Sequence, residues 1–543
     1  MLRGEFRHRD GELIEHSTGR RIFVRGVNVP AKLPPFKHNL SADDLERLRS
    51  FGFTAIRLIV VWEALEPNER QYDHNYMLHI RSTVRLCAKH QLSVLIDPHQ
   101  DCWSRWTGGD GAPRWTLGRL GFRLQNREAC AAAVTDFHGG GHPLLWSTNY
   151  HLFATATMFT LFFASERFAP HVTVDGLSAR EWLQTRFIDA FAALAAVLKD
   201  ERNVIGFGTL NEPSLGWIGC RDLRRVPTPY RFGYALSPQQ CIRLAHGGSV
   251  WGALFYGYPF VPTGWRRLNP ERRRLMEEGV SIWPETLKPD HFALGPDEDP
   301  ETVFLRPFWD AFGRRIRERG GEDLYMFTEP VPMESLAYRP KHTPHSRELH
   351  APHYYDLVSM GMQRFLSWFA FDFSTGWPAL FNATRARHNT VAMLQATVLG
   401  EVGMCWLGKA TDAAFDATFH AIESNRTPAV FIWYIPDHAS NSDGWNGEDF
   451  SIWSESRLRL RSAVRPYPLR VAGRPVLMRH NESCFMLQFV GADDCFETLI
   501  YTTPRCKRVT VSDGSCSVDG LYVRYTHAPT LGDAVHSVCV WFD

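Results

Sequence analysis

Short apolar runs without charge recur along most of the chain, and longer stretches that repeat their apolar residues with a helical period separate them. The runs are typical of buried strands, and the longer stretches are typical of amphipathic helices. Strands are predicted in a segment that ends at 26–29 and at 54–62, 92–98, 204–210, 324–329, 349–355, 397–403 and 429–433. Helices are predicted at 43–51 with Ser41 as N-cap, at 76–90 and at 180–198. This alternation predicts an α/β fold, a (β/α)8 TIM barrel.

The two ends of the chain follow a different pattern. Residues 5–25 contain short strand-like segments separated by turns, which predicts a hairpin. After residue 466, short strand-like segments follow one another closely, which is typical of a small all-β sandwich. We therefore expect a barrel domain over 1–465 and a C-terminal β-sandwich domain over 466–543. A long insertion at about 215–300, rich in Pro, Gly and aromatic residues, is predicted to be a lid or a binding element.

Glutamates at the ends of two predicted strands are the candidates for chemistry. Glu212 follows Asn211 at the end of the apolar run 204–210, and Pro213 stops that strand. Glu401 stands at the end of another apolar run. In a (β/α)8 barrel the chemistry lies at the C-terminal ends of the strands, where we expect both carboxyl groups. A glycosidase needs two such groups, one protonated to assist the leaving oxygen and one ionised to attack the sugar or activate water.

The motifs resemble those of glycoside hydrolase family 5. Asn211-Glu212-Pro213 and Gly400-Glu401-Val402-Gly403 look like the motifs of its fourth and seventh strands. The loop 102–113 and the region 433–453 resemble one subgroup, the fungal glucosylceramidases and steryl β-glucosidases, which are related to endoglycoceramidases. The resemblance covers most of residues 20–480. It implies a retaining β-glucosidase that hydrolyses a glycolipid, glucosylceramide or a steryl β-glucoside, to glucose and lipid.

The resemblance also implies roles for individual residues. Glu212 would be the acid/base and Glu401 the nucleophile. A charged Arg57 inside an apolar strand is costly unless it is paired; it would contact the nucleophile together with Tyr355, while His353 would serve the acid/base. The expected substrate-binding residues are Arg57, His99, Asp101, Asn211, His353, Tyr355, Trp433 and Lys32. No metal and no cofactor are expected.

Composition limits the classes of molecule that the protein is expected to bind and the compartment in which it is expected to work. The formal net charge is +1, so there is no electrostatic case for nucleic-acid binding. The N-terminal residues lack the apolar segment of a signal peptide, and eleven scattered cysteines show no zinc-binding spacing. We therefore expect a cytoplasmic protein with reduced thiols. The apolar run 151–164 is too short and too rich in Thr to span a bilayer, which leaves only a peripheral contact with membranes.

The lipid part of the substrate needs an apolar surface. We expect the run Met158–Phe163 and the insertion around Trp251 and Trp265 to line an apolar groove beside the site, the alternative being that the run is an ordinary core helix.

Two other functions stay open. One is an endo-acting glycosidase, either an endoglycoceramidase or an endo-β-glucanase, and the other is a non-catalytic glycolipid-binding barrel. The presence of both glutamates favours catalysis.

Overall fold

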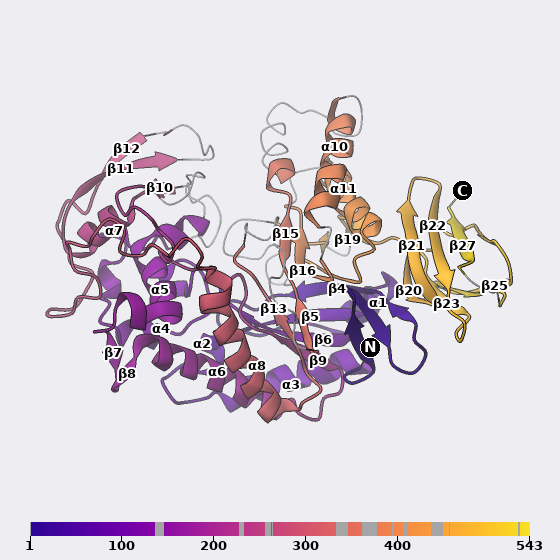
Figure 1. Cartoon of the computed structure of the whole chain (residues 1–543), viewed down its shortest axis with the longest axis horizontal. Helices are drawn as coiled ribbons and strands as arrows, with labels where there is room; N and C mark the ends of the chain where they lie inside the picture. The colour runs from indigo at the N-terminus through magenta and orange to yellow at the C-terminus, as the bar shows by residue number, and fades with distance from the viewer. Residues whose placement is uncertain are drawn as a thin grey trace.

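The computed structural model consists of a parallel barrel surrounded by helices and a group of antiparallel sheets at one side (Figure 1). It describes residues 2–135, 146–226, 233–255, 262, 264–332, 346–360, 377–393, 396–405, 410–435, 449–454, 457–529 and 533–542. Within the region 433–453, whose sequence resembles the fungal subgroup, residues 436–448 lie outside the described residues.

The barrel is a parallel sheet with the strand order β14-β13-β9-β6-β5-β4-β17-β16-β15. Its strands are β4 (Val24–Val29), β5 (Ala55–Val61), β6 (Ser93–His99), β9 (Val204–Gly208), β13 (Tyr325–Thr328), β14 (Glu348–His350), β15 (His353–Tyr355), β16 (Val398–Gly403) and β17 (Ala429–Ile432). The strands β4, β5 and β6 are buried along their whole length, as their mostly apolar sequences require. All eight predicted barrel strands are confirmed.

The sixth strand closes the barrel although it is broken in the middle. Its first half, β14, pairs with β13, and its second half, β15, pairs with β16. Between them lie Ala351 and Pro352, and proline has no N–H to continue the ladder. Because β14 and β15 form the two ends of the strand order and belong to one segment, the sheet closes on itself. The predicted (β/α)8 architecture is therefore confirmed.

Helices follow the barrel strands as predicted. They are α1 (Ala42–Ser50), α2 (Trp62–Leu65), α3 (His74–Lys89), α4 (Arg114–Gly118), α5 (Phe153–Phe168), α6 (Ala179–Val197), α7 (Pro238–Ala245), α8 (Arg306–Gly320), α10 (Trp377–Ala392) and α11 (Ala410–Ser424). Ser41 caps α1 in a capping box with Asp44. The predicted helices at 43–51, 76–90 and 180–198 correspond to α1, α3 and α6.

The helix α5 corrects one expectation. Every residue of the run Met158–Phe163 is buried. Phe162 packs edge-on against Trp103, Phe187 and Phe308, which lie on three different elements. A helix that is apolar all round must be covered all round. The expectation that this run lines a groove for lipid is therefore wrong, and the run is a core helix.

The insertion forms a small antiparallel sheet of its own. It contains β10 (Gly233–Ala235), β11 (Val250–Phe255) and β12 (Gly264–Leu268), in that order. The side chains of Trp251 and Trp265 are on the surface, with 62% and 66% of their area exposed. The described residues therefore place both tryptophans on an open sheet face, not inside an apolar groove as expected.

The C-terminal residues form two sheets that share one apolar core. The first has the order β1-β2-β3-β20-β23-β26-β25 and the second the order β21-β22-β27-β24. Their strands are β1 (Phe6–Arg9), β2 (Glu12–Glu15), β3 (Arg21–Ile22), β20 (Tyr467–Val471), β21 (Gly473–His480), β22 (Cys484–Gly491), β23 (Glu497–Tyr501), β24 (Arg508–Val511), β25 (Ser515–Asp519), β26 (Tyr522–Thr526) and β27 (Val535–Trp541). Short hairpins β7 (Thr173–Val174) with β8 (Leu177–Ser178), and β18 (Trp453–Ser454) with β19 (Arg457–Leu458), complete the strands. The predicted all-β sandwich is confirmed.

The N-terminal hairpin is part of this sandwich. β1 pairs with β2 as predicted, and β3 pairs with β20 through Ile22 and Arg470. Phe23, the residue between β3 and the first barrel strand, is buried in the sandwich core. The boundary expected at 465/466 stays a prediction, but the first sheet joins segments from both ends of the chain.

Two further features are the state of the cysteines and the character of the helices. All eleven cysteines are free thiols in the structure. Among the described residues, no helix combines the length and the apolar character that crossing a membrane requires.

Candidate active site

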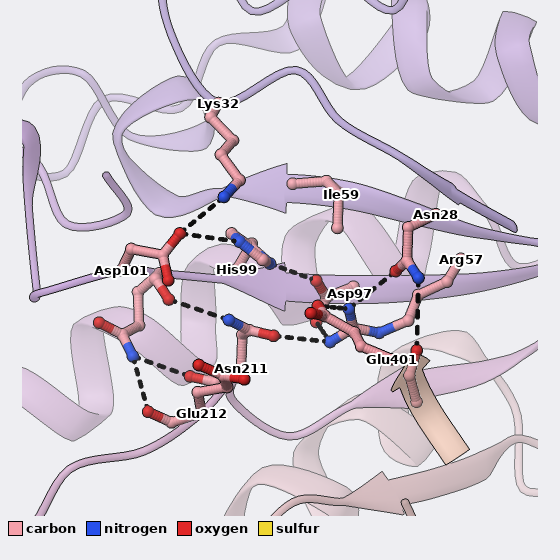
Figure 2. A network of polar contacts seen from close by, with 12 residues as sticks. Asn28, Lys32, Arg57, Ile59, Asp97, His99, Asp101, Asn211, Glu212 and Glu401 are labelled. Atoms are coloured by element: carbon pink, nitrogen blue, oxygen red, sulfur yellow. Dashed lines mark hydrogen bonds and ion pairs between the residues drawn. The ribbon is translucent and has the colours of Figure 1, made fainter. Parts of the chain in front are cut away.

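The guanidinium of Arg57 lies at the centre of a buried polar network at the C-terminal ends of the barrel strands (Figure 2). Its Nη1 donates to Asn28 Oδ1 at 2.9 Å and to Glu401 Oε1 at 2.5 Å. Its Nη2 donates to Asn211 Oδ1 and Glu329 Oε1, and lies the same 2.8 Å from Asp97 Oδ1. A buried charge needs compensation of this kind. The neighbouring carboxylates raise the pKa of Arg57 although burial alone would lower it.

Glu212 stands in a tight turn directly after β9. Its backbone φ is 39°, in the left-handed region that residues other than glycine seldom adopt, at a typical penalty of about 1–3 kcal/mol. Gln100 Nε2 donates to the carbonyls of both Asn211 and Glu212, at 2.8 and 3.0 Å. The Glu212 N–H donates to Glu329 Oε2 at 3.0 Å. These bonds hold the turn so that the Glu212 side chain, 18% exposed, faces the site.

Glu401 is held from two sides. Tyr355 Oη donates to its Oε2 at 2.7 Å, and Arg57 donates to its Oε1. His353 Nδ1 lies 3.6 Å from Glu401 Oε2 and 2.9 Å from Glu212 Oε1, so this ring connects the two glutamates. A Cβ at Gly400 would lie 2.9 Å from His353 Nε2, which explains why glycine precedes Glu401. Oxygens of Glu212 and Glu401 come within 4.8 Å of each other.

The pKa values of the two glutamates shift in opposite directions. Burial raises the pKa of Glu212, and the nearby Glu401 charge adds to this effect, while contact with His353 opposes it. Burial would also raise the pKa of Glu401, but the positive charges of His353 and Arg57 outweigh it and lower that pKa. Burial lowers the pKa of His353, yet the Glu401 and Glu329 carboxylates raise it well above its usual value. The site therefore favours a protonated Glu212 beside an ionised Glu401.

A second cluster lies beside the first and is joined to it through Asp97. His99 Nδ1 lies 2.7 Å from Asp97 Oδ2, and its Nε2 lies 3.4 Å from Asp101 Oδ2. Lys32 Nζ donates to Asp101 Oδ2 at 2.7 Å. Burial and Lys32 would lower the pKa of His99, but Asp97 and Asp101 raise it to about 10. Lys32 and His99 hold the pKa of Asp101 well below its usual range, against the effect of burial.

Trp433 follows β17 and covers this cluster. Its ring is stacked on His99, with 5.8 Å between ring centroids and an interplanar angle of 10°, and Lys32 Nζ lies 4.6 Å from its centroid. Such a cation–π contact fixes the lysine above the ring. Trp433 therefore takes part in the site, together with Lys32, His99 and Asp101.

Among the described residues, two groups of side chains have the donors and spacing for a metal ion. One is His99, Asp101 and Asp110, and the other is Glu212, His353 and Glu401; the donor atoms within each group lie within 4.8 Å of one another. Lys32 already supplies a positive charge to the first group, and Arg57 supplies one to the second. The expectation that no metal is needed stays a prediction.

The structure brings together all ten residues that the sequence indicated, and adds others. Asp97, Gln100 and Glu329 are central to the network, and Asn28 also contacts Arg57. Glu329 follows the fifth apolar strand in the same way as Glu212 follows the fourth, so the same signal could have identified it. Asp97 lies inside the third strand, where a charged residue in an apolar run was the available signal.

Comparison with known proteins gives consistent matches. Residues 17–224 match the family model Cellulase (glycosyl hydrolase family 5). A glucosylceramidase from Rhizopus delemar is 26% identical over 96% of this chain and 94% of that protein. An ergosteryl-beta-glucosidase from Saccharomyces cerevisiae is 28% identical over 82% of this chain and 75% of that protein.

Solved structures show the same fold. A crystal structure of sterylglucosidase 1 from Cryptococcus neoformans superposes with a TM-score of 0.86 and 24% identity, and the match covers 100% of this chain and 97% of that one. The family match includes Arg57, His99 and Glu212. The resemblance noted from the sequence is thus confirmed by the match of residues 17–224 to glycosyl hydrolase family 5.

Proposed function

We propose that the protein is a retaining β-glucosidase that hydrolyses the β-glucosidic bond of a glycolipid, glucosylceramide or a steryl β-glucoside, to glucose and lipid. The main support is the pair Glu212 and Glu401, whose oxygens come within 4.8 Å while their pKa values shift in opposite directions. Retaining glycosidases have carboxyl groups about 5–5.5 Å apart, whereas inverting enzymes leave more room for water. The names of the relatives from Rhizopus delemar and Saccharomyces cerevisiae support the substrate class.

In the first step Glu212 is the acid. Its raised pKa favours the protonated carboxyl group, which donates its proton to the oxygen of the leaving lipid. Glu401, kept ionised by His353, Arg57 and Tyr355, attacks the anomeric carbon and forms a covalent bond to the sugar. The glucosidic bond breaks as the new bond forms, and the lipid leaves with the proton.

In the second step Glu212 changes to a base. The negative charge of Glu401 contributes to the raised pKa of Glu212. Because that charge disappears when Glu401 is bonded to the sugar, the pKa of Glu212 falls and the group gives up its proton more readily. The ionised Glu212 then removes a proton from water, which attacks the anomeric carbon and releases glucose with retained configuration.

The remaining residues would bind the glucose. Asn211 would hydrogen-bond the 2-hydroxyl, because its amide lies in the same network as Glu401 and Arg57. Lys32, His99, Asp101 and Trp433 would bind the distal hydroxyls and the face of the sugar ring, since they form the adjoining cluster.

A substrate panel with stereochemical analysis tests the proposal. The purified protein is incubated with glucosylceramide, a steryl β-glucoside, cellobiose and an aryl β-glucoside, and the first anomer released is followed by NMR. We expect β-glucose first and activity on a lipid glucoside. Initial α-glucose would contradict retention, and release of an intact disaccharide from a longer glycolipid would indicate endo action instead.

We further propose that the protein is cytoplasmic and keeps its thiols reduced. Eleven free cysteines distributed over the barrel and the sandwich support this. Thiol titration of the protein denatured without reductant should find about eleven equivalents. If the titration found that most of the cysteines are already joined in disulfides, the proposed compartment would be contradicted.

A further inference from the structure

The exposed face of the insertion sheet carries two tryptophans. In the pairing of β11 with β12, Trp251 is opposite Arg267 and Ala253 is opposite Trp265. Residues that face each other in an antiparallel pair project to the same side, so Trp251, Trp265 and Arg267 share one face. Large exposed aromatic side chains gathered on one face indicate an interaction surface. We call these three residues the tryptophan face.

The strand β12, which carries Trp265, and the residues that follow it form a basic segment. Residues 264–274 contain five arginines and one acidic residue, Glu271. Arg266, Arg267, Arg272 and Arg274 are exposed, and Glu271 is paired with Arg273. The whole chain has a net charge of only +1, so this segment is a local concentration of positive charge. A surface that combines tryptophan with arginine matches the boundary of a bilayer, where apolar chains meet anionic headgroups.

The opposite face of the same sheet is fixed to the barrel near the site. Leu254 packs against Val134 and Trp146. The Trp146 carbonyl accepts a hydrogen bond from Cys102 Sγ at 3.6 Å, and Cys102 directly follows Asp101. The tryptophan face is therefore the outer side of a wall whose inner side contacts the loop of the sugar-binding cluster. In Figure 1 this sheet stands at the upper left, away from the C-terminal sandwich.

We propose that the tryptophan face docks the enzyme on the surface of a lipid bilayer that contains anionic lipids. This inference rests on the proposed function, because a glycolipid substrate resides in such a bilayer. The indole rings enter the boundary between headgroups and acyl chains, and Arg267 contacts lipid phosphates. Docking there brings the site close to the lipid that carries the glucose.

Binding to vesicles without substrate is the direct test. The full chain is sedimented with phosphatidylcholine vesicles that contain or lack phosphatidylserine. We expect binding to the anionic vesicles that weakens with added salt. Trp251→Ala and Trp265→Ala should each lower the partition coefficient about tenfold, and Arg267→Glu should lower it about fivefold or more.

Matched control variants test whether the loss of any exposed apolar side chain or any exposed positive charge has the same effect on vesicle binding. Leu78→Ala removes a side chain that is 52% exposed on α3, and Arg474→Glu reverses an exposed charge on β21. Both should bind vesicles as the wild type does. Absence of wild-type binding, or equal binding by the Trp251→Ala/Trp265→Ala variant, would overturn the inference. Self-association in vesicle-free buffer that this double variant abolishes, without vesicle binding, would instead assign the face to a second copy of the chain.

Kinetics separate this inference from the proposed activity. The double variant should raise KM for a lipid glucoside in vesicles while leaving hydrolysis of a soluble aryl β-glucoside and the melting temperature unchanged. Equal losses on both substrates would show that the tryptophans support the fold and would overturn docking. If the wild type binds vesicles but hydrolyses no glucoside, the docking inference survives and the proposed function fails.

Discussion

At the scale of single residues, two neighbouring carboxyl groups shift their pKa values in opposite directions. Burial raises the pKa of Glu212, whereas the cations His353 and Arg57 lower the pKa of Glu401 against the effect of burial. Four cationic side chains, Lys32, Arg57, His99 and His353, lie among the carboxyl groups of this site. Small changes in this arrangement should therefore appear first in the pH dependence of the reaction.

Glu401→Gln should abolish turnover of every β-glucoside, because an amide can neither attack the anomeric carbon nor leave it. Steady-state release of glucose and of aryl alcohol measures this. Glu482→Gln, an exposed position in the sandwich, is the matched control and should behave as the wild type. Near-normal activity of Glu401→Gln would remove the proposed nucleophile.

Glu212→Gln should lower kcat for a lipid glucoside by about 10²–10⁴-fold, the usual contribution of a general acid. An aryl glucoside with a good leaving group needs no acid in its first step, so a burst of aryl alcohol should persist. Pre-steady-state kinetics on the two substrates check the difference. Loss of the burst together with turnover would mean that the first step needs Glu212 even when the leaving group is good, which would contradict its role as the general acid.

Tyr355→Phe should move the acidic limb of the kcat/KM profile to higher pH. The Tyr355 hydroxyl donates to Glu401 Oε2 and helps to lower the pKa of that carboxyl, so its loss lets the pKa rise. The nucleophile then needs a higher pH to ionise. The ring can keep its edge-on contact with Phe450, and the melting temperature serves as the control. An unmoved acidic limb would contradict the assigned role.

Sequence reasoning found the site residues that stand out from their surroundings. Arg57 and the strand-end glutamates were visible because charges are rare in apolar strands. Gln100 was not predictable, since it acts through the carbonyls of Asn211 and Glu212, and only the folded turn shows that these need donors. Residues that support a backbone conformation leave no pattern in the chain.

At the scale of elements, the loop between β6 and α4 is built around a close backbone approach. Asp101 and Asp110 pair as an isolated bridge. A Cβ on Gly109 would lie 1.6 Å from the Asp101 carbonyl, so no larger residue fits without moving the loop. Burial and the neighbouring Asp101 raise the pKa of Asp110 well above its usual value. The loop thus determines where Asp101 stands relative to Lys32.

Gly109→Ala should displace this loop and weaken sugar binding. We expect a higher KM for all glucosides, because Asp101 and Lys32 would lose their contact at 2.7 Å. Gly118→Ala is the matched control, because a Cβ there meets nothing within 4 Å. Titration with a glucose-like inhibitor measures the change. Equal affinities of the two variants would show that the loop does not position the binding residues.

The elements themselves were largely predictable, with one informative failure. Periodicity located the eight barrel strands and the helices α1, α3 and α6, because each has a clear apolar run or stripe. Periodicity could not decide whether α5 lies in the core or lines a groove, because a helix that is apolar all round has no polar side to show which side faces solvent. The break at Pro352 was also missed, because the strand keeps its direction across it.

At the scale of the whole molecule, the sandwich and the barrel are joined by more than a linker. β3 pairs with β20, and Tyr467 Oη donates to the carbonyl of Gly52 at 2.6 Å in the barrel. Tyr501 Oη donates to Ser50 O at 2.8 Å. These contacts couple the stability of the two parts.

Phe23→Ala should destabilise the whole molecule by about 3–5 kcal/mol, the usual effect of removing a buried phenylalanine. Phe23 lies between β3 and β4 and is buried in the sandwich core, so we expect one unfolding transition at a lower temperature. Calorimetry and circular dichroism measure this, with Leu78→Ala as the exposed control. Two separate transitions, of which only one moves, would contradict the coupling.

The shared sheet also affects how the protein is made. On the ribosome, residues 6–22 emerge long before residues 467–471, so β3 waits for its partner while the entire barrel is synthesised. During that time its unpaired edge and Phe23 are open to contacts with other chains. We expect nascent chains stopped before residue 467 to be cut readily by protease between β1 and β3, and to need chaperones until synthesis is finished.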